Sequence, residues 1–137
     1  MVRKTLRIAA LAVITAGIVV IASSASKAAA AAGIEEIMKK SFNKKVGVFP
    51  KIGPAVKEGK WEDAQKYAKT LAEGGAALPA TTCPQGDAKS WEKLTKKFAV
   101  ETKAVADATA MKDATAVEAA LKALNASCKA CHDAHRN

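Results

Sequence analysis

The most informative stretch of this chain is VEAALKALNASCKACH, residues 117–132. Apolar residues and cysteines recur in it at intervals of three or four: Val117, Leu121, Leu124, Cys128 and Cys131. Residues with this spacing share one face of an α-helix. The pattern therefore predicts a helix whose apolar face continues into the two cysteines.

Within this stretch Cys128, Cys131 and His132 form a C-x-x-C-H motif. Each thiol can add to one vinyl group of a porphyrin, and the next histidine can then bind the iron from the proximal side. As a redox dithiol the motif would leave His132 without a role, and a zinc site would lack its other two ligands. An incidental structural pair is the third alternative. We predict one covalent haem c at Cys128 and Cys131, near the C-terminus, with His132 as proximal iron ligand.

The N-terminus has the pattern of a secretory signal peptide. Arg3, Lys4 and Arg7 precede an apolar run, residues 8–21, and small residues follow up to Ala25. An uncleaved membrane anchor is the alternative, but the run has 14 residues, where a spanning helix needs about 20. We therefore predict a signal peptide over residues 1–25, a flexible segment over 26–33 and a periplasmic domain over 34–137. The protein would be bound to the membrane only if the leader stays uncleaved.

Composition favours a small helical domain. The chain has 137 residues, only 4% of them aromatic, and it is rich in alanine. Without residues 1–25 it has 19 basic and 13 acidic residues, a charge of +6. The lysines are dispersed, with no arginine-rich block and no alternation of basic and aromatic residues. This pattern argues against nucleic-acid binding and favours an acidic protein partner.

Hydrophobic periodicity predicts four helices in one domain. Asp87 can cap the third helix, and Thr115 with Glu118 forms a capping-box pattern at the start of the fourth. Glycines and prolines predict a loop over Val46–Gly59, with at most a short turn of helix after Pro54. The expected helices cover Ile34–Lys45, Trp61–Ala77, Ala88–Met111 and the stretch from Thr115 through the haem motif.

A haem motif this close to the C-terminus resembles that of the class II c-type cytochromes, the cytochrome c′ proteins and their low-spin relatives. Their ending is close to C-x-x-C-H-x-x-[FY]-[RK]; here Arg136 agrees with it, and His135 replaces the aromatic residue. The resemblance implies an all-α, up-down-up-down four-helix bundle and places Arg136 near the haem. Dimers through the first two helices occur in this family, so a homodimer is one expected state.

The sixth iron ligand is open to three interpretations. In the resembled family the first helix faces the distal side of the iron, with methionine in low-spin members and a non-ligating apolar residue in high-spin ones. Met38 lies on the expected apolar face of the first helix, and we predict that it binds the iron. An open distal site and a thiolate from Cys83 are the alternatives. We expect His135 to lie on the surface or behind the proximal ligand.

Two functions follow from these alternatives. A haem with His132 and Met38 as ligands indicates an electron carrier that docks through its lysines to an acidic redox partner. An open apolar distal site indicates a cytochrome c′-type binder of nitric oxide or carbon monoxide. We predict the first function. The inner face of the first helix offers only Ser41 as a polar group, so we do not expect an enzyme.

Overall fold

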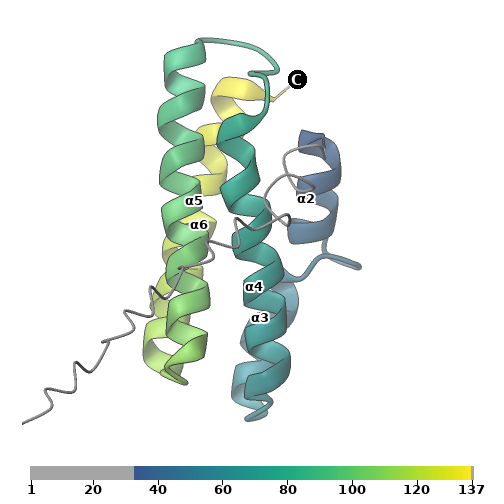
Figure 1. The fold of residues 1–137 in the computed structure, drawn as a ribbon, viewed down its shortest axis with the longest axis vertical. Helices are drawn as coiled ribbons and strands as arrows, with labels where there is room; N and C mark the ends of the chain where they lie inside the picture. Colours follow the sequence, from purple (N-terminus) through teal and green to yellow (C-terminus); the bar gives the residue numbers. More distant parts are fainter. Residues whose placement is uncertain (1–32, 137) are drawn as a thin grey trace, which may run out of the picture.

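The computed structural model describes residues 33–136, so the predicted signal peptide, 1–25, and residues 26–32 lie outside the described residues. The described part is helical throughout and contains no strand, which confirms the predicted all-α class (Figure 1). Its helices are α2 (Ile34–Phe42), α3 (Phe49–Lys57), α4 (Trp61–Ala77), the short 3₁₀ helix η1 (Leu78–Ala80), α5 (Ala88–Ala110) and α6 (Ala114–His135).

The helices form a bundle in which the first member is divided in two. α4, α5 and α6 run in alternating directions, and α5 packs against both of the others (Figure 1). α2 lies beside the C-terminal half of α4, and α3 continues along the N-terminal half. Together α2 and α3 occupy the place of the first helix in an up-down-up-down four-helix bundle.

The predicted loop over Val46–Gly59 is wrong, because most of it forms α3. Pro50 lies in the first turn, where a missing N–H costs nothing, and only Pro54 interrupts the helix interior. Ile52 and Ala55 are buried on one side of α3. Burial of this apolar side stabilises a helix that the local breakers oppose.

The first predicted helix ends three residues early, at Phe42. The side-chain oxygen of Asn43 accepts hydrogen bonds from the backbone N–H groups of Lys45 (2.9 Å) and Val46 (3.2 Å). An asparagine that binds the backbone ahead of it favours a turn over a helix. This turn separates α2 from α3.

α4 has the predicted bounds, and its two glycines are sites of close helix packing. A Cβ on Gly75 would lie 2.0 Å from the Thr102 hydroxyl on α5, and one on Gly74 would lie 2.8 Å from the Ser41 hydroxyl on α2. Contacts under 3.0 Å require something to move. The glycines thus let α2 and α5 approach α4 closely.

The last two helices are long, uninterrupted and capped. Asp87 caps α5 as predicted, accepting a 2.7 Å hydrogen bond from the Ser90 N–H. The predicted cap of α6 is wrong: Asp113 accepts from the Ala116 N–H at 2.9 Å, and Thr115 lies inside the first turn. Asp113 directly follows the short turn between α5 and α6 and directly precedes α6, so it occupies the N-cap position.

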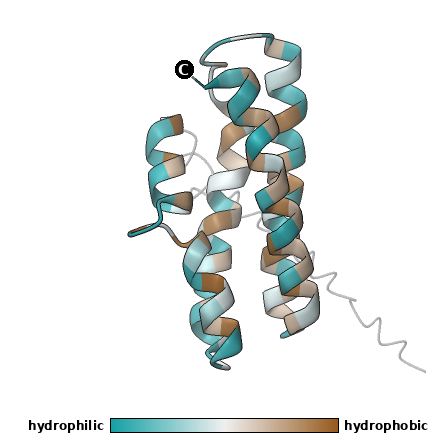
Figure 2. Cartoon of the chain, turned by 180° about the vertical axis from the view of Figure 1, so that it is seen from behind, coloured by the Kyte–Doolittle hydropathy of each residue, from teal (hydrophilic) through white to brown (hydrophobic). Residues whose placement is uncertain are grey.

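The core consists of small and aliphatic residues with two aromatic rings. Figure 2 shows hydrophilic and hydrophobic residues alternating around the helices, as expected for amphipathic elements. Thr95, Thr102 and Thr109 are also buried on α5, and each hydroxyl donates to a carbonyl of its own helix. Among residues 33–136, no helix is long and apolar enough to cross a membrane.

Candidate haem-attachment site

The C-x-x-C-H motif lies entirely within α6, and its last residue, His132, lies three residues before the C-terminal end of this helix. Regular helix therefore places Cys128, Cys131 and His132 on one face, as predicted. Both cysteines are partly buried, and Cys131 packs against the hydrophobic core. His132 is exposed. The arrangement presents two thiols at the edge of the core and an accessible imidazole beside them.

The two thiols are free, with no disulfide between them. The Cys128 Sγ donates to the Leu124 carbonyl at 3.5 Å. Burial raises the pKa of Cys128, and the Glu101 carboxylate adds to the rise. Burial also raises the pKa of Cys131, with smaller additions from Cys128 and Cys83. Both groups are therefore thiols at neutral pH, not thiolates.

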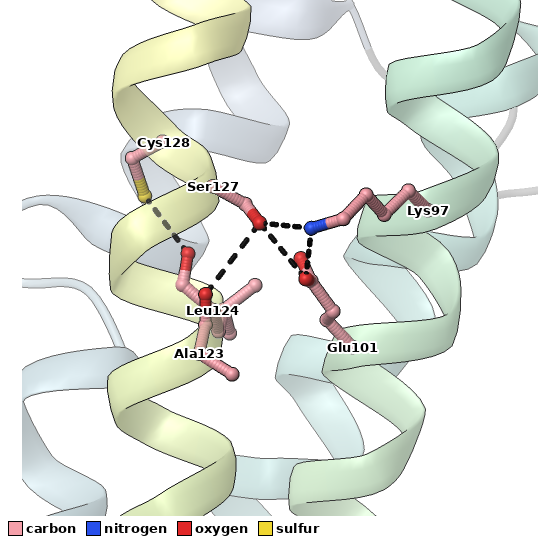
Figure 3. Close-up of polar contacts among 6 residues, drawn as sticks. All are labelled: Lys97, Glu101, Ala123, Leu124, Ser127 and Cys128. Atoms are coloured by element: carbon pink, nitrogen blue, oxygen red, sulfur yellow. Dashed lines mark hydrogen bonds and ion pairs between the residues drawn. The ribbon is translucent and has the colours of Figure 1, made fainter.

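A polar cluster adjoins Cys128 at the interface of α5 and α6 (Figure 3). Ser127 donates to Glu101 Oε1 at 2.8 Å and accepts from Lys97 Nζ at 2.6 Å. Lys97 also forms an ion pair with Glu101. This cluster was not predicted from the sequence, where the available signal was the spacing of four residues between Lys97 and Glu101 on one helix face.

His135 is buried, so of the two positions expected for it the one on the surface is wrong, and no observation tests the position behind the proximal ligand. Its Nδ1 lies 2.7 Å from the Gln85 carbonyl, and its Nε2 lies 3.1 Å from the Ser90 hydroxyl. With Nδ1–H donating, Nε2 is free to accept the Ser90 proton. The ring also meets Trp91 edge-on, with centroids 5.3 Å apart. His135 thus packs against an aromatic ring of α5 and also contacts the loop before α5.

Gly86 makes this close approach of loop and helix end feasible. It has a positive φ of 82°, and a Cβ there would lie 2.7 Å from the Ala134 carbonyl oxygen. A side chain at this position would be strained and would push the loop away from α6. The loop, Gly86 and His135 together fix the last turn of α6.

Cys83 and Arg136 lie near this helix end. The Cys83 Sγ donates to the Gln85 carbonyl at 3.0 Å and lies 3.6 Å from His135 Nδ1. The Arg136 side chain is exposed, and its backbone N–H donates to the His132 carbonyl at 3.1 Å. The contact of Arg136 with His132 is thus an ordinary helical hydrogen bond of the backbone, whereas Cys83 belongs to the contacts around His135.

Met38 lies on α2, which packs beside α4 in the half of the bundle where α6 also ends (Figures 1 and 2). The side chain is partly buried and packs against the same hydrophobic core as Cys131. Met111 is 70% exposed, so of these two methionines only Met38 is directed into the bundle. In the part of the chain that the structure describes, no group of three or more His, Cys, Asp or Glu side chains could hold a metal ion by itself.

The comparison with known protein families agrees with the resemblance seen in the sequence. Residues 85–136 match the family model described as Cytochrome C'. The match covers α5 and α6 with the loop end that contacts His135, and it does not reach α2, α3 or α4. No curated protein and no solved structure matches the chain. Over residues 85–136, this helical chain is therefore similar to the cytochrome c′ family of class II c-type cytochromes, which are haem proteins.

Proposed function

We propose that the protein is a periplasmic monohaem c-type cytochrome that carries single electrons between redox partners. The observation that carries the proposal is the face of α6 on which two protonated, partly buried thiols adjoin an exposed imidazole. Cys128 and Cys131 would form the two thioether bonds, each S–H adding across one vinyl group. His132 would bind the iron. Two cysteines and the adjacent histidine are the donor set that a haem c requires.

Covalent attachment is tested by extraction with acid-acetone. Thioether-bound haem should stay with the polypeptide, while non-covalent haem passes into the organic layer. Cys128→Ala combined with Cys131→Ala should release the colour, and the matched variant Cys83→Ser should retain it. Extraction of most of the haem from the unmutated protein would contradict covalent attachment.

Met38 is proposed as the distal ligand. Its support is its partly buried side chain on α2, a helix in the same half of the bundle as the motif, and the core it shares with Cys131. When bound, the haem supplies a one-electron couple. His132 and Met38 would hold the iron from two packed helices, and this pair of ligands would keep water and small ligands from it. Thioether ligation favours reduced iron and raises the potential.

Replacement of Met38 tests the carrier function directly. The ferrous protein should resist carbon monoxide, and Met38→Ala should turn the iron high-spin and admit the gas. The bundle should survive with a cavity. Met111→Ala is the matched control because that side chain is exposed, and Cys83→Ser should also leave the absorption spectrum unchanged.

Binding of nitric oxide or carbon monoxide is the second candidate function. It is favoured by the family matched, Cytochrome C', and by the extent of the match, which leaves out the helix that carries Met38. An unmutated protein that is already high-spin and binds carbon monoxide readily would favour this function over electron transfer.

Surface charge suggests how the carrier meets its partner. The chain without its leader has a charge of +6, and its lysines are dispersed. Long-range attraction of an acidic redox partner would speed encounter and weaken with added salt. Nucleic acid is not a proposed partner, a homodimer remains an expected state, and we propose no enzymatic activity. Export through cleavage of residues 1–25 completes the proposal and rests on the sequence alone.

A further inference from the structure

Glu101 is the least satisfied charged side chain at the α5–α6 interface. Its Oε1 accepts from Ser127 and pairs with Lys97. Its Oε2 is buried, with no hydrogen-bond partner among the described residues. The side chain is only 16% exposed, whereas that of Lys97 is 56% exposed. A carboxylate so placed is screened by solvent far less than its partner is.

Glu101 also lies next to the first haem cysteine. Ser127, which binds Glu101, directly precedes Cys128 in α6 (Figure 3). The carboxylate is close enough to contribute to the raised pKa of the Cys128 thiol, after the larger effect of burial. The negative charge therefore acts on the position at which one edge of the macrocycle would be attached.

We propose that Glu101 lowers the reduction potential of the haem attached at Cys128, with Lys97 as an opposing, weaker charge. The proposal rests on the covalent haem of the proposed function. Reduction adds one electron from the donor and lowers the charge of the iron centre by one. A fixed negative charge nearby therefore stabilises the oxidised form, and a fixed positive charge stabilises the reduced form.

Electrode titration of the purified holoprotein tests this assignment. Glu101→Gln retains the shape and the Ser127 hydrogen bond but removes the charge, so the midpoint potential should rise. Asp107→Asn is the matched control, because Asp107 pairs with Lys103 four residues away on the same helix but is 57% exposed. That variant should leave the potential almost unchanged.

Lys97→Met supplies the reciprocal test; it also removes the counter-ion of Glu101, so the unfolding midpoint is measured beside the potential. The potential should fall, by less than it rises in Glu101→Gln, and the double variant should lie between the two single variants. The absorption spectrum should be unchanged in all variants, because no axial ligand is altered. A purely structural role for Glu101 would change the unfolding midpoint but not the potential.

The outcomes separate this inference from the function on which it rests. If haem resists acid-acetone and Glu101→Gln has the wild-type potential, the role of Glu101 is refuted while the covalent cytochrome stands. If the haem is extracted, the covalent assignment itself fails. A fall in potential in Glu101→Gln would also overturn the proposal, since its sign is opposite to that of the electrostatic effect.

Discussion

The α5–α6 pair and the α2–α3 pair are stabilised by different means. α5 and α6 have 23 and 22 residues and begin at aspartates whose side chains cap the first turn. α2 and α3 have nine residues each, and neither has a side-chain cap. Isolated helices of nine residues are unstable in water. The longer pair thus has local signals for its structure, whereas the shorter pair depends on contacts with α4.

Ile52→Ala should have the largest effect, because it removes the main buried contact of α3. Ile52 is fully buried, and loss of such a side chain costs about 2–5 kcal/mol of unfolding free energy. Val100→Ala on α5 is the control: Val100 is 69% exposed, and its loss should cost less than about 0.5 kcal/mol. Urea unfolding of both variants measures the difference. Equal costs would show that α3 does not depend on burial.

The same difference explains what could be predicted from the sequence. Periodicity located the α4 bounds, the start of α5 and the haem motif on α6, because those signals are local. α3 was predicted as a loop, because Pro50, Gly53 and Pro54 are local breakers and the burial of Ile52 is a tertiary effect. Propensity is routinely overridden by packing of this kind.

At the site, sequence spacing predicted which residues of one helix lie together, but it did not predict contacts between different helices. Cys128, Cys131 and His132 share a face because a helix has a fixed geometry. The partners of His135 come from 45 and 50 residues away, and Glu101 lies 26 residues from Ser127. No local pattern encodes such pairs, so the burial of His135 was missed.

His135→Phe should have an intermediate effect on the unfolding free energy. It tests how far the contacts of His135 with the loop before α5 stabilise the α5–α6 pair. Phenylalanine can keep the contact with Trp91, but it loses both hydrogen bonds of the imidazole. Cys83 still donates to the Gln85 carbonyl, so only Ser90 is left without its ring partner. We expect a loss of about 1–3 kcal/mol in unfolding free energy.

Denaturant unfolding measures that loss, and His135→Ala supplies the comparison. The alanine variant removes the ring as well, so it should be the less stable of the two. Hydrogen exchange should locate the added opening in the last turn of α6 and leave the first turn unchanged. A His135→Phe protein as stable as the wild type would mean that the ring acts here only by packing.

Asp113→Ala should have the smallest effect, and it tests the helix start that the sequence misassigned. The Asp113 side chain accepts from the Ala116 N–H, and loss of an N-cap costs about 0.5–2 kcal/mol. Asp113→Asn should retain most of the stability, because its side-chain oxygen can still accept the bond. Thr115→Ala is the matched control, since Thr115 is exposed within the first turn and should change stability by less than about 0.5 kcal/mol. Urea unfolding of the three variants measures these losses in unfolding free energy. A larger loss in Thr115→Ala than in Asp113→Ala would support the capping box at Thr115 instead.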